Sequence, residues 1–96
     1  CQTFDPDATI HSRAFAPKLG IPEDPATGSA AGAAGAYLSR NKFISKENCE
    51  NIFIEQGHMM GRPSSLFVCI EKNKDEIKSV RVGGESVTLI KGEIST

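Results

Sequence analysis

The sequence predicts an α+β domain in which a strongly curved, mostly antiparallel sheet surrounds one buried helix. Three observations support this fold class. Residues 29–40 are rich in alanine and glycine and carry no charge before Arg40, short β-compatible runs precede and follow them, and glycine or proline separates most of these runs. At 96 residues the chain forms at most one domain with one modest core.

The N-terminal part predicts extended segments followed by a loop. Residues 9–15 and those before them favour β-structure, and the turn Asp5-Pro6-Asp7 separates two extended pieces. Three prolines and Gly20 punctuate residues 17–25. We therefore expect residues 18–26 to be irregular backbone that leads into the helix.

The predicted helix covers residues 29–40 and stops at Asn41. From residue 28 to residue 38 only two side chains carry polar atoms, a composition that predicts burial on all sides rather than on one face. Gly32 and Gly35 each cost about 1 kcal/mol of helix propensity relative to alanine, so we expect close approach of neighbouring chain to compensate.

Four β-like runs follow the helix, at residues 51–56, 65–71, 77–82 and 86–90. Gly83-Gly84 predicts a two-residue hairpin between the last two runs, and residues 73–75 predict a turn between the second and the third. Together with the N-terminal segments, these runs predict about six short strands around the helix.

Composition and charge exclude several classes of partner. Eleven basic and twelve acidic residues are interspersed and give a net charge of -1, which argues against nucleic acid or an anionic membrane surface as a partner. No apolar stretch approaches the roughly 20 residues that span a bilayer, and the N-terminus lacks the pattern of a signal peptide. A cytoplasmic protein is the expectation.

The cysteines predict neither a disulfide framework nor a metal site. Cys1, Cys49 and Cys69 are odd in number, lie far apart and form no CxxC or His/Cys spacing, so we expect reduced thiols and no zinc. Cys69 is expected in the core of its strand. Because the chain begins at Cys1 rather than at a methionine, we expect it to be a fragment.

The segment 24–30 carries the residues best suited to chemistry. The first N–H groups of a helix lack intrahelical acceptors, and the helix dipole adds partial positive charge, so a carboxylate or phosphate binds there. Gly28 leaves the amides accessible, and Thr27 and Ser29 add hydroxyl groups. Asp24 lies close enough to accept a hydrogen bond from a ligand or to move a proton.

A simpler interpretation of the same residues is that Asp24 or Thr27 only caps the helix. The clustering of Gly, Ser and Thr before an uncharged helix favours a binding site. A phosphate-binding P-loop is excluded because no lysine follows the glycines, and no GxGxxG motif is present.

Other polar residues are expected to have structural roles. His11 and His58 are assigned to structural or solvent contacts, and Arg62 to a structural ion pair. Glu23 adjoins Asp24, but successive side chains of an extended loop point apart, so Glu23 is expected to be a surface group or a loop anchor.

The sequence contains five strings in this order: Arg13-Ala14-Phe15-Ala16-Pro17, the stretch from Gly20 to Ala30 that contains EDPATGSA, Glu55-Gln56-Gly57, Met60-Gly61-Arg62-Pro63-Ser64, and Val82-Gly83-Gly84. Together these strings resemble the C-terminal part of the phenazine-biosynthesis PhzF-like proteins. The EDPATGSA string is highly specific, and the resemblance covers nearly the whole chain.

The resemblance implies a cofactor-independent isomerase of the diaminopimelate-epimerase fold. In this family two similar domains, each a barrel-like sheet around a central helix, enclose the substrate between them. Residues 1–96 are then the C-terminal portion of the second domain, and the N-terminal domain is absent. The implied partners are a small-molecule carboxylate substrate, the remainder of the two-domain protein and a second copy in a homodimer, with no metal and no organic cofactor.

The resemblance also assigns site residues. The aspartate that matches Asp24 contacts the substrate in the cleft, and the residues that match Gly28 and Ser29 bind its carboxylate. The proton-shuttling glutamate of the family and a neighbouring histidine lie in the N-terminal domain, so the fragment alone is expected to be inactive. The alternative function is a non-catalytic small-molecule-binding or structural module of the same fold.

Overall fold

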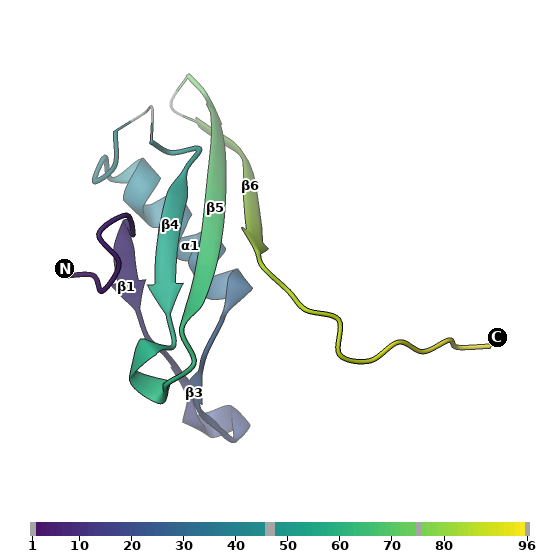
Figure 1. Ribbon diagram of the computed structural model, residues 1–96. Helices are drawn as coiled ribbons and strands as arrows, with labels where there is room; N and C mark the ends of the chain where they lie inside the picture. Colours follow the sequence, from purple (N-terminus) through teal and green to yellow (C-terminus); the bar gives the residue numbers. More distant parts are fainter. Residues whose placement is uncertain (1, 46–47, 75, 96) are drawn as a thin grey trace.

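The computed structural model describes residues 2–45, 48–74 and 76–95. Within them, a helix α1 (Gly28–Arg40) packs on one face of a four-stranded sheet of order β1-β4-β5-β6 (Figure 1). The strands of this sheet are β1 (Ile10–Ser12), β4 (Ile52–Gln56), β5 (Ser64–Asn73) and β6 (Glu76–Gly84). The described elements confirm the predicted α+β class.

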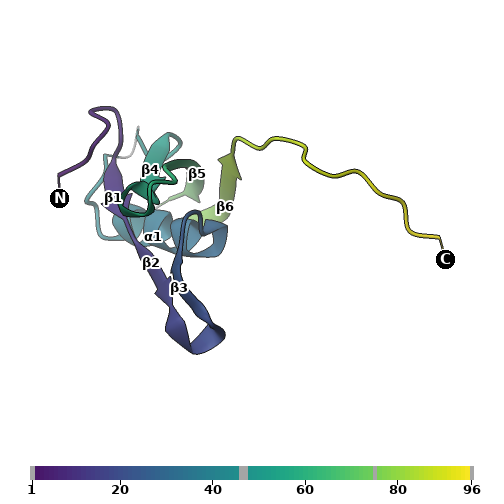
Figure 2. The same cartoon turned by 60° about the horizontal axis from the view of Figure 1, so that its bottom comes forward.

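The sheet is mixed. Strand β1 runs parallel to β4, whereas β4 with β5 and β5 with β6 are antiparallel. A separate two-stranded ribbon of β2 (Ala14–Ala16) and β3 (Ile21–Asp24) projects from the end of the sheet near the start of α1 (Figure 2). Two short 3-10 turns complete the fold, η1 (Pro17–Leu19) between β2 and β3 and η2 (His58–Met60) between β4 and β5.

The core lies between α1 and the sheet. Alternate residues of β4 and β5 point towards the helix, as the two-residue period of a strand requires. The buried apolar residues are Ala31 from α1, Cys49, Ile52, Ile54, Leu66, Val68 and Ile70. Cys69 lies between two of these and points to the opposite face, where it is only half-buried, so its predicted place in the core is wrong.

The helix glycines provide close contact with the sheet, as predicted. A Cβ atom added at Gly35 would lie 2.6 Å from Val68 Cγ1, and one added at Gly32 would lie 3.2 Å from Val82 Cγ2. Both distances are shorter than ordinary carbon contacts, so the backbone of α1 sits where an alanine would displace the neighbouring valine. This packing offsets the cost of two glycines inside a helix.

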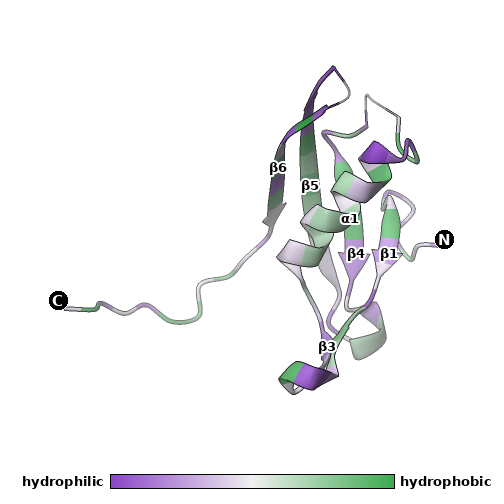
Figure 3. Cartoon of the chain, turned by 180° about the vertical axis from the view of Figure 1, so that it is seen from behind, coloured by the Kyte–Doolittle hydropathy of each residue, from purple (hydrophilic) through white to green (hydrophobic). Residues whose placement is uncertain are grey.

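The prediction that the helix is buried on all sides is wrong for this chain. Ala30 and Ala33 are exposed, and Tyr37 is 61% exposed. Figure 3 shows α1 in front of the sheet with its outer face uncovered. The reason is that, in the described residues, strands cover the helix from one side, and the sheet does not close into a barrel.

The predicted hairpin at Gly83-Gly84 and the strand at residues 86–90 are also wrong. Strand β6 continues through both glycines, with Gly83 paired to Phe67 and Gly84 to Leu66. Residues 85–95 then leave the sheet as an extended segment (Figure 1), in which Ile90 is 91% exposed. A β-like run forms a strand only beside a partner, and the described part of the chain offers none here.

The loop predicted for residues 18–26 is more regular than expected. It contains η1 and β3, and β3 pairs with β2 through Ala14 opposite Asp24 and Ala16 opposite Ile21. Pro22 is accommodated because β3 is a strand at an edge. The predicted run at residues 9–15 divides into β1 and β2, and the turn predicted at 73–75 lies partly outside the described residues.

The two described cysteines are free thiols. Cys49 is buried and donates through its Sγ to Ser39 Oγ at 3.3 Å, and Cys69 makes no disulfide. Cys1 lies outside the described residues. No described helix has both the length and the apolar character needed to cross a membrane.

Candidate ligand-binding site at the start of the helix

The start of α1 is open. Thr27 is the N-cap residue with extended backbone (φ -123°), and no side chain caps the helix. The first intrahelical bond runs from the Ala31 N–H to the Thr27 carbonyl at 3.0 Å. Among the described residues, the N–H groups of Gly28, Ser29 and Ala30 meet no acceptor, and all three residues are exposed. Such a terminus attracts an anion.

Asp24 lies beside this terminus. The Thr27 hydroxyl donates to Asp24 Oδ2 at 2.7 Å, and both residues are half-buried. The interpretation in which Asp24 or Thr27 only caps the helix is wrong for this structure, because neither side chain accepts a helix N–H. The geometry joins four predicted site residues, since Asp24, Thr27, Gly28 and Ser29 all lie at one end of α1.

The end of β4 supports the loop that carries Asp24. Gln56 is 2% exposed, and its Nε2 donates to the Asp24 carbonyl at 2.7 Å and to Thr27 Oγ1 at 3.0 Å. Its Oε1 accepts a hydrogen bond from Ser12 Oγ at 3.3 Å. The segment before α1 is therefore held by a side chain that lies about thirty residues later in the sequence.

Gly57 permits close approach of two loops. Its φ is +87°, a left-handed conformation that favours glycine. An added Cβ would lie 2.3 Å from the carbonyl oxygen of Arg62 and 2.8 Å from that of Pro25. The turn after β4 therefore packs directly against the backbone of the loop before α1.

The sequence did not predict the buried cluster of side chains around Glu55. Glu55 is 1% exposed, and its carboxylate accepts the N–H groups of Phe4 and Asp5 at 2.5 and 2.9 Å. His11 Nδ1 lies 3.1 Å from Oε1, and His58 Nε2 lies 3.7 Å from Oε2. The Phe4 ring stacks on His58 with 5.0 Å between ring centroids. The structural roles predicted for both histidines are consistent with these contacts.

The cluster anchors the N-terminal segment to the sheet. The ligand atoms of His11, Glu55 and His58 lie within 4.8 Å of one another, a spacing that a metal ion can bridge. Both carboxylate oxygens, however, already accept backbone N–H groups. The contacts present therefore account for the buried charge without a further ligand.

These contacts act on the ionisation of Glu55. Burial raises the pKa of its carboxyl group, but the backbone hydrogen bonds from Asp5 and Phe4, the hydrogen bond from His11 and the charge of His58 outweigh burial, so the pKa is lowered from 4.5. A carboxylate whose pKa is lower in the folded state stabilises the fold above its unfolded pKa, and this contribution disappears as the pH falls through the folded value.

We predict that Glu55→Gln lowers the free energy of unfolding at pH 7 by about 1.5 kcal/mol, because the amide group leaves one buried N–H facing a donor and removes the charge. Urea denaturation at several pH values measures this. The difference from wild type should begin to shrink as the pH falls below 4.5, where the Glu55 carboxylate of the unfolded chain takes up a proton, and should disappear as the pH falls through the lower pKa of the folded carboxylate. A difference that is independent of pH would contradict the assignment.

Glu23 acts as a loop anchor, as predicted. Arg13 Nη2 donates to Glu23 Oε1 at 2.8 Å, which joins the start of the β2–β3 ribbon to its end. The hydrogen bond from Arg13 lowers the pKa of the Glu23 carboxyl group. The ion pair predicted for Arg62 is not present among the described residues, in which Arg62 is exposed.

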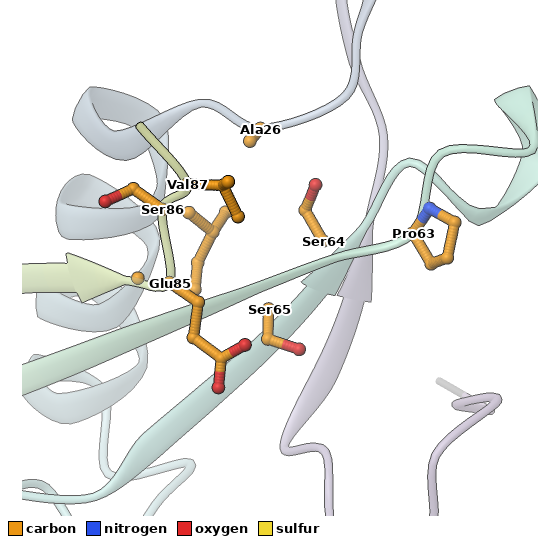
Figure 4. Close-up of a pocket in the computed structure, with 9 residues that line it drawn as sticks. Ala26, Pro63, Ser64, Ser65, Glu85, Ser86 and Val87 are labelled. Atoms are coloured by element: carbon orange, nitrogen blue, oxygen red, sulfur yellow. The ribbon is translucent and has the colours of Figure 1, made fainter. Parts of the chain in front are cut away.

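A pocket of about 370 Å³ lies next to the loop before α1 (Figure 4). It is lined by Ala26, by the start of β5 and by the residues that follow β6, and the Ser64 hydroxyl points across it towards Ala26. Asp24, Gly28 and Ser29 do not line this pocket. The open helix terminus is therefore a surface site beside the pocket rather than inside it.

Comparison with known proteins identifies the family. A family model described as "Phenazine biosynthesis-like protein" matches residues 2–92. An uncharacterized isomerase of Clostridium acetobutylicum is 40% identical over 91 residues, which are 94% of this chain and 30% of that protein. The trans-2,3-dihydro-3-hydroxyanthranilate isomerase of Pseudomonas chlororaphis is 43% identical over 83 residues, 86% of this chain and 29% of that protein.

An uncharacterized isomerase of Schizosaccharomyces pombe is 33% identical over 87 residues, which are 90% of this chain and 47% of that protein. The chain thus spans between 29% and 47% of the length of these three relatives. Because the family model covers almost all of the sequence, this chain belongs to the phenazine biosynthesis-like protein family.

Proposed function

We propose that this chain forms part of a cofactor-independent isomerase, which moves a proton within a small carboxylate-bearing metabolite by general acid/base catalysis. The observation that carries the proposal is the set of unpaired N–H groups at residues 28–30 beside the Asp24 carboxylate. The names of the relatives support the same class of reaction, since all three are isomerases.

In this proposal the substrate carboxylate binds the N–H groups of Gly28 and Ser29, where the helix dipole favours negative charge. Asp24 accepts a hydrogen bond from an amine or hydroxyl group of the substrate, or helps to move its proton. The isomerisation removes a proton from one carbon and returns a proton to another, so the composition of the substrate does not change. Fixing the carboxylate aligns the reacting carbon with the base.

The base itself belongs, by family resemblance, to a domain outside residues 1–96. The 96-residue chain alone is therefore proposed to be inactive, and the remainder of a two-domain protein is its partner. In the diaminopimelate epimerase-like fold, further strands cover the face of α1 that is exposed in this chain. By the same family resemblance, we propose that the complete protein forms a homodimer. Size-exclusion chromatography with light scattering tests the dimer.

The reaction is tested with protein expressed from the complete coding sequence. The probe is trans-2,3-dihydro-3-hydroxyanthranilate, followed by a panel of small amino and hydroxy carboxylates, in deuterium oxide. Proton NMR should show a rearranged product that carries deuterium at a carbon atom. The 96-residue chain, assayed in parallel, should show none.

The alternative, a non-catalytic binding or structural module, makes a different prediction. Such a module binds carboxylates at the start of α1 but leaves every carbon-bound hydrogen of the panel unexchanged. Binding without exchange would replace the proposed isomerase with this module. If the protein shows neither binding nor exchange, the assignment of the helix start as a substrate site is refuted.

A further inference from the structure

Gln56 connects three parts of the chain that are distant in sequence. It is the last residue of β4, and its side chain is almost completely buried, with 2% exposure. Its amide contacts Ser12 at the end of β1, Asp24 at the end of β3 and Thr27 just before α1. The other residues of β4 that face the helix, Ile52 and Ile54, are apolar core residues.

The direction of each hydrogen bond follows from chemistry. The Asp24 backbone carbonyl can only accept, so the amide nitrogen of Gln56 must face it, at 2.7 Å. The same nitrogen donates its second proton to Thr27 Oγ1 at 3.0 Å. The amide oxygen is then left for the hydroxyl of Ser12.

The hydrogen bond from Gln56 also fixes the direction of the hydrogen bond between Thr27 and Asp24. Because Thr27 Oγ1 accepts from Gln56, its single hydroxyl proton is free to point at Asp24 Oδ2, which lies 2.7 Å away. No other hydrogen bond reaches the Asp24 carboxylate in the described part of the chain, so Oδ1 is left for a ligand. Gln56 thus holds Asp24 twice, at its backbone directly and at its side chain through Thr27.

We infer that Gln56 is a positioning residue for the Asp24 carboxylate. Through Thr27 it fixes the rotamer of Asp24, and through the Asp24 carbonyl it fixes the loop next to the open N–H groups of α1. An apolar residue of similar size would fill the same space without either hydrogen bond. The expected loss of kcat rests on the proposed function, whereas the expected effect on the Asp24 rotamer does not.

The catalytic test uses Gln56→Leu, Thr27→Val and the double variant in protein expressed from the complete coding sequence. Each single variant should lower kcat about 10- to 100-fold with a smaller change in KM, because misplacement of a group by about 1 Å can cost this much. The double variant should lose no more kcat than the less active of the two single variants, because both changes break one chain of hydrogen bonds. Thr27→Ser keeps the hydroxyl group and should therefore retain the kcat of wild type.

Ile54→Val is the matched control, because it also alters a buried side chain of β4 that faces the helix but makes no hydrogen bond to the loop. It should keep kcat within about twofold of wild type. If Gln56→Leu fails to fold, Gln56→Glu replaces it, since a side chain of the same shape then presents an oxygen where the amide nitrogen was. The expected loss in kcat is the same.

A structural readout separates this inference from the proposed function. Crystal structures of Gln56→Leu or Gln56→Glu should show Asp24 in another rotamer, with Thr27 Oγ1 beyond hydrogen-bond distance of Oδ2. This result would support the positioning role even if no substrate is turned over. An unchanged Asp24 in the variant crystals, or losses of kcat that add in the double variant, would overturn it.

Discussion

Asp24→Asn in protein expressed from the complete coding sequence is expected to lower kcat/KM by about 10²- to 10⁴-fold, the range in which a general acid/base group contributes. The amide has the same shape and still accepts the Thr27 hydroxyl, so the loop and the helix start should be preserved. What changes is the charge and one acceptor atom at the position that is proposed to face the ligand. Steady-state kinetics, with circular dichroism to verify the fold, measure the effect.

Glu23→Gln is the matched control for this variant. Glu23 is the adjacent carboxylate, but it pairs with Arg13 at the base of the β2–β3 ribbon rather than facing the helix start. Its loss should change kcat/KM by less than about threefold, because a single exposed ion pair contributes little. Equal losses in both variants would show that the loop, and not the Asp24 carboxylate, matters for turnover.

The element that the sequence predicted best is α1. Its predicted range of 29–40 differs from the observed Gly28–Arg40 by one residue, and the glycines inside it do pack against valines of the sheet. These features are local, because composition and stop residues determine them. The grouping of Asp24 with the helix start was also predictable, since the residues are close in sequence.

The surroundings of the helix were not predictable in the same way. Small apolar side chains indicate how closely a neighbour can approach, but they do not indicate whether that neighbour belongs to the same 96 residues. Ala30 and Ala33 are therefore exposed although their composition predicts burial. The exposed apolar residues after β6 illustrate the same limit, because a strand needs a partner as well as a pattern.

The supports of the site were missed for a different reason. Glu55 and Gln56 lie in a strand where alternation alone predicts one buried and one exposed residue, and yet both are buried. Their hydrogen-bond partners, among them Phe4, Ser12 and Thr27, lie more than twenty-five residues away. A polar residue next to an apolar run gives no sign of which distant donor will satisfy it.

Among these supports, Gly57 should be the residue least tolerant of change, and Gly57→Ala is expected to lower the free energy of unfolding by about 2–4 kcal/mol. Left-handed backbone costs a non-glycine residue about 1–2 kcal/mol, and forced overlap in a packed region adds a similar amount. The overlap at Gly57 involves the backbone oxygens of Arg62 and Pro25, which no change of rotamer can relieve. Urea denaturation measures the loss.

Gly61→Ala separates the two contributions. Gly61 has a similar φ of +71° at the other end of η2, but an added Cβ there meets no atom within 4 Å. This variant should lose about 1 kcal/mol, which is the conformational cost alone. Because the Pro25 oxygen belongs to the loop before α1, Gly57→Ala should also weaken carboxylate binding at Gly28, whereas Gly61→Ala should not. Equal destabilisation in the two variants would mean that the loop contact at Gly57 contributes nothing to stability.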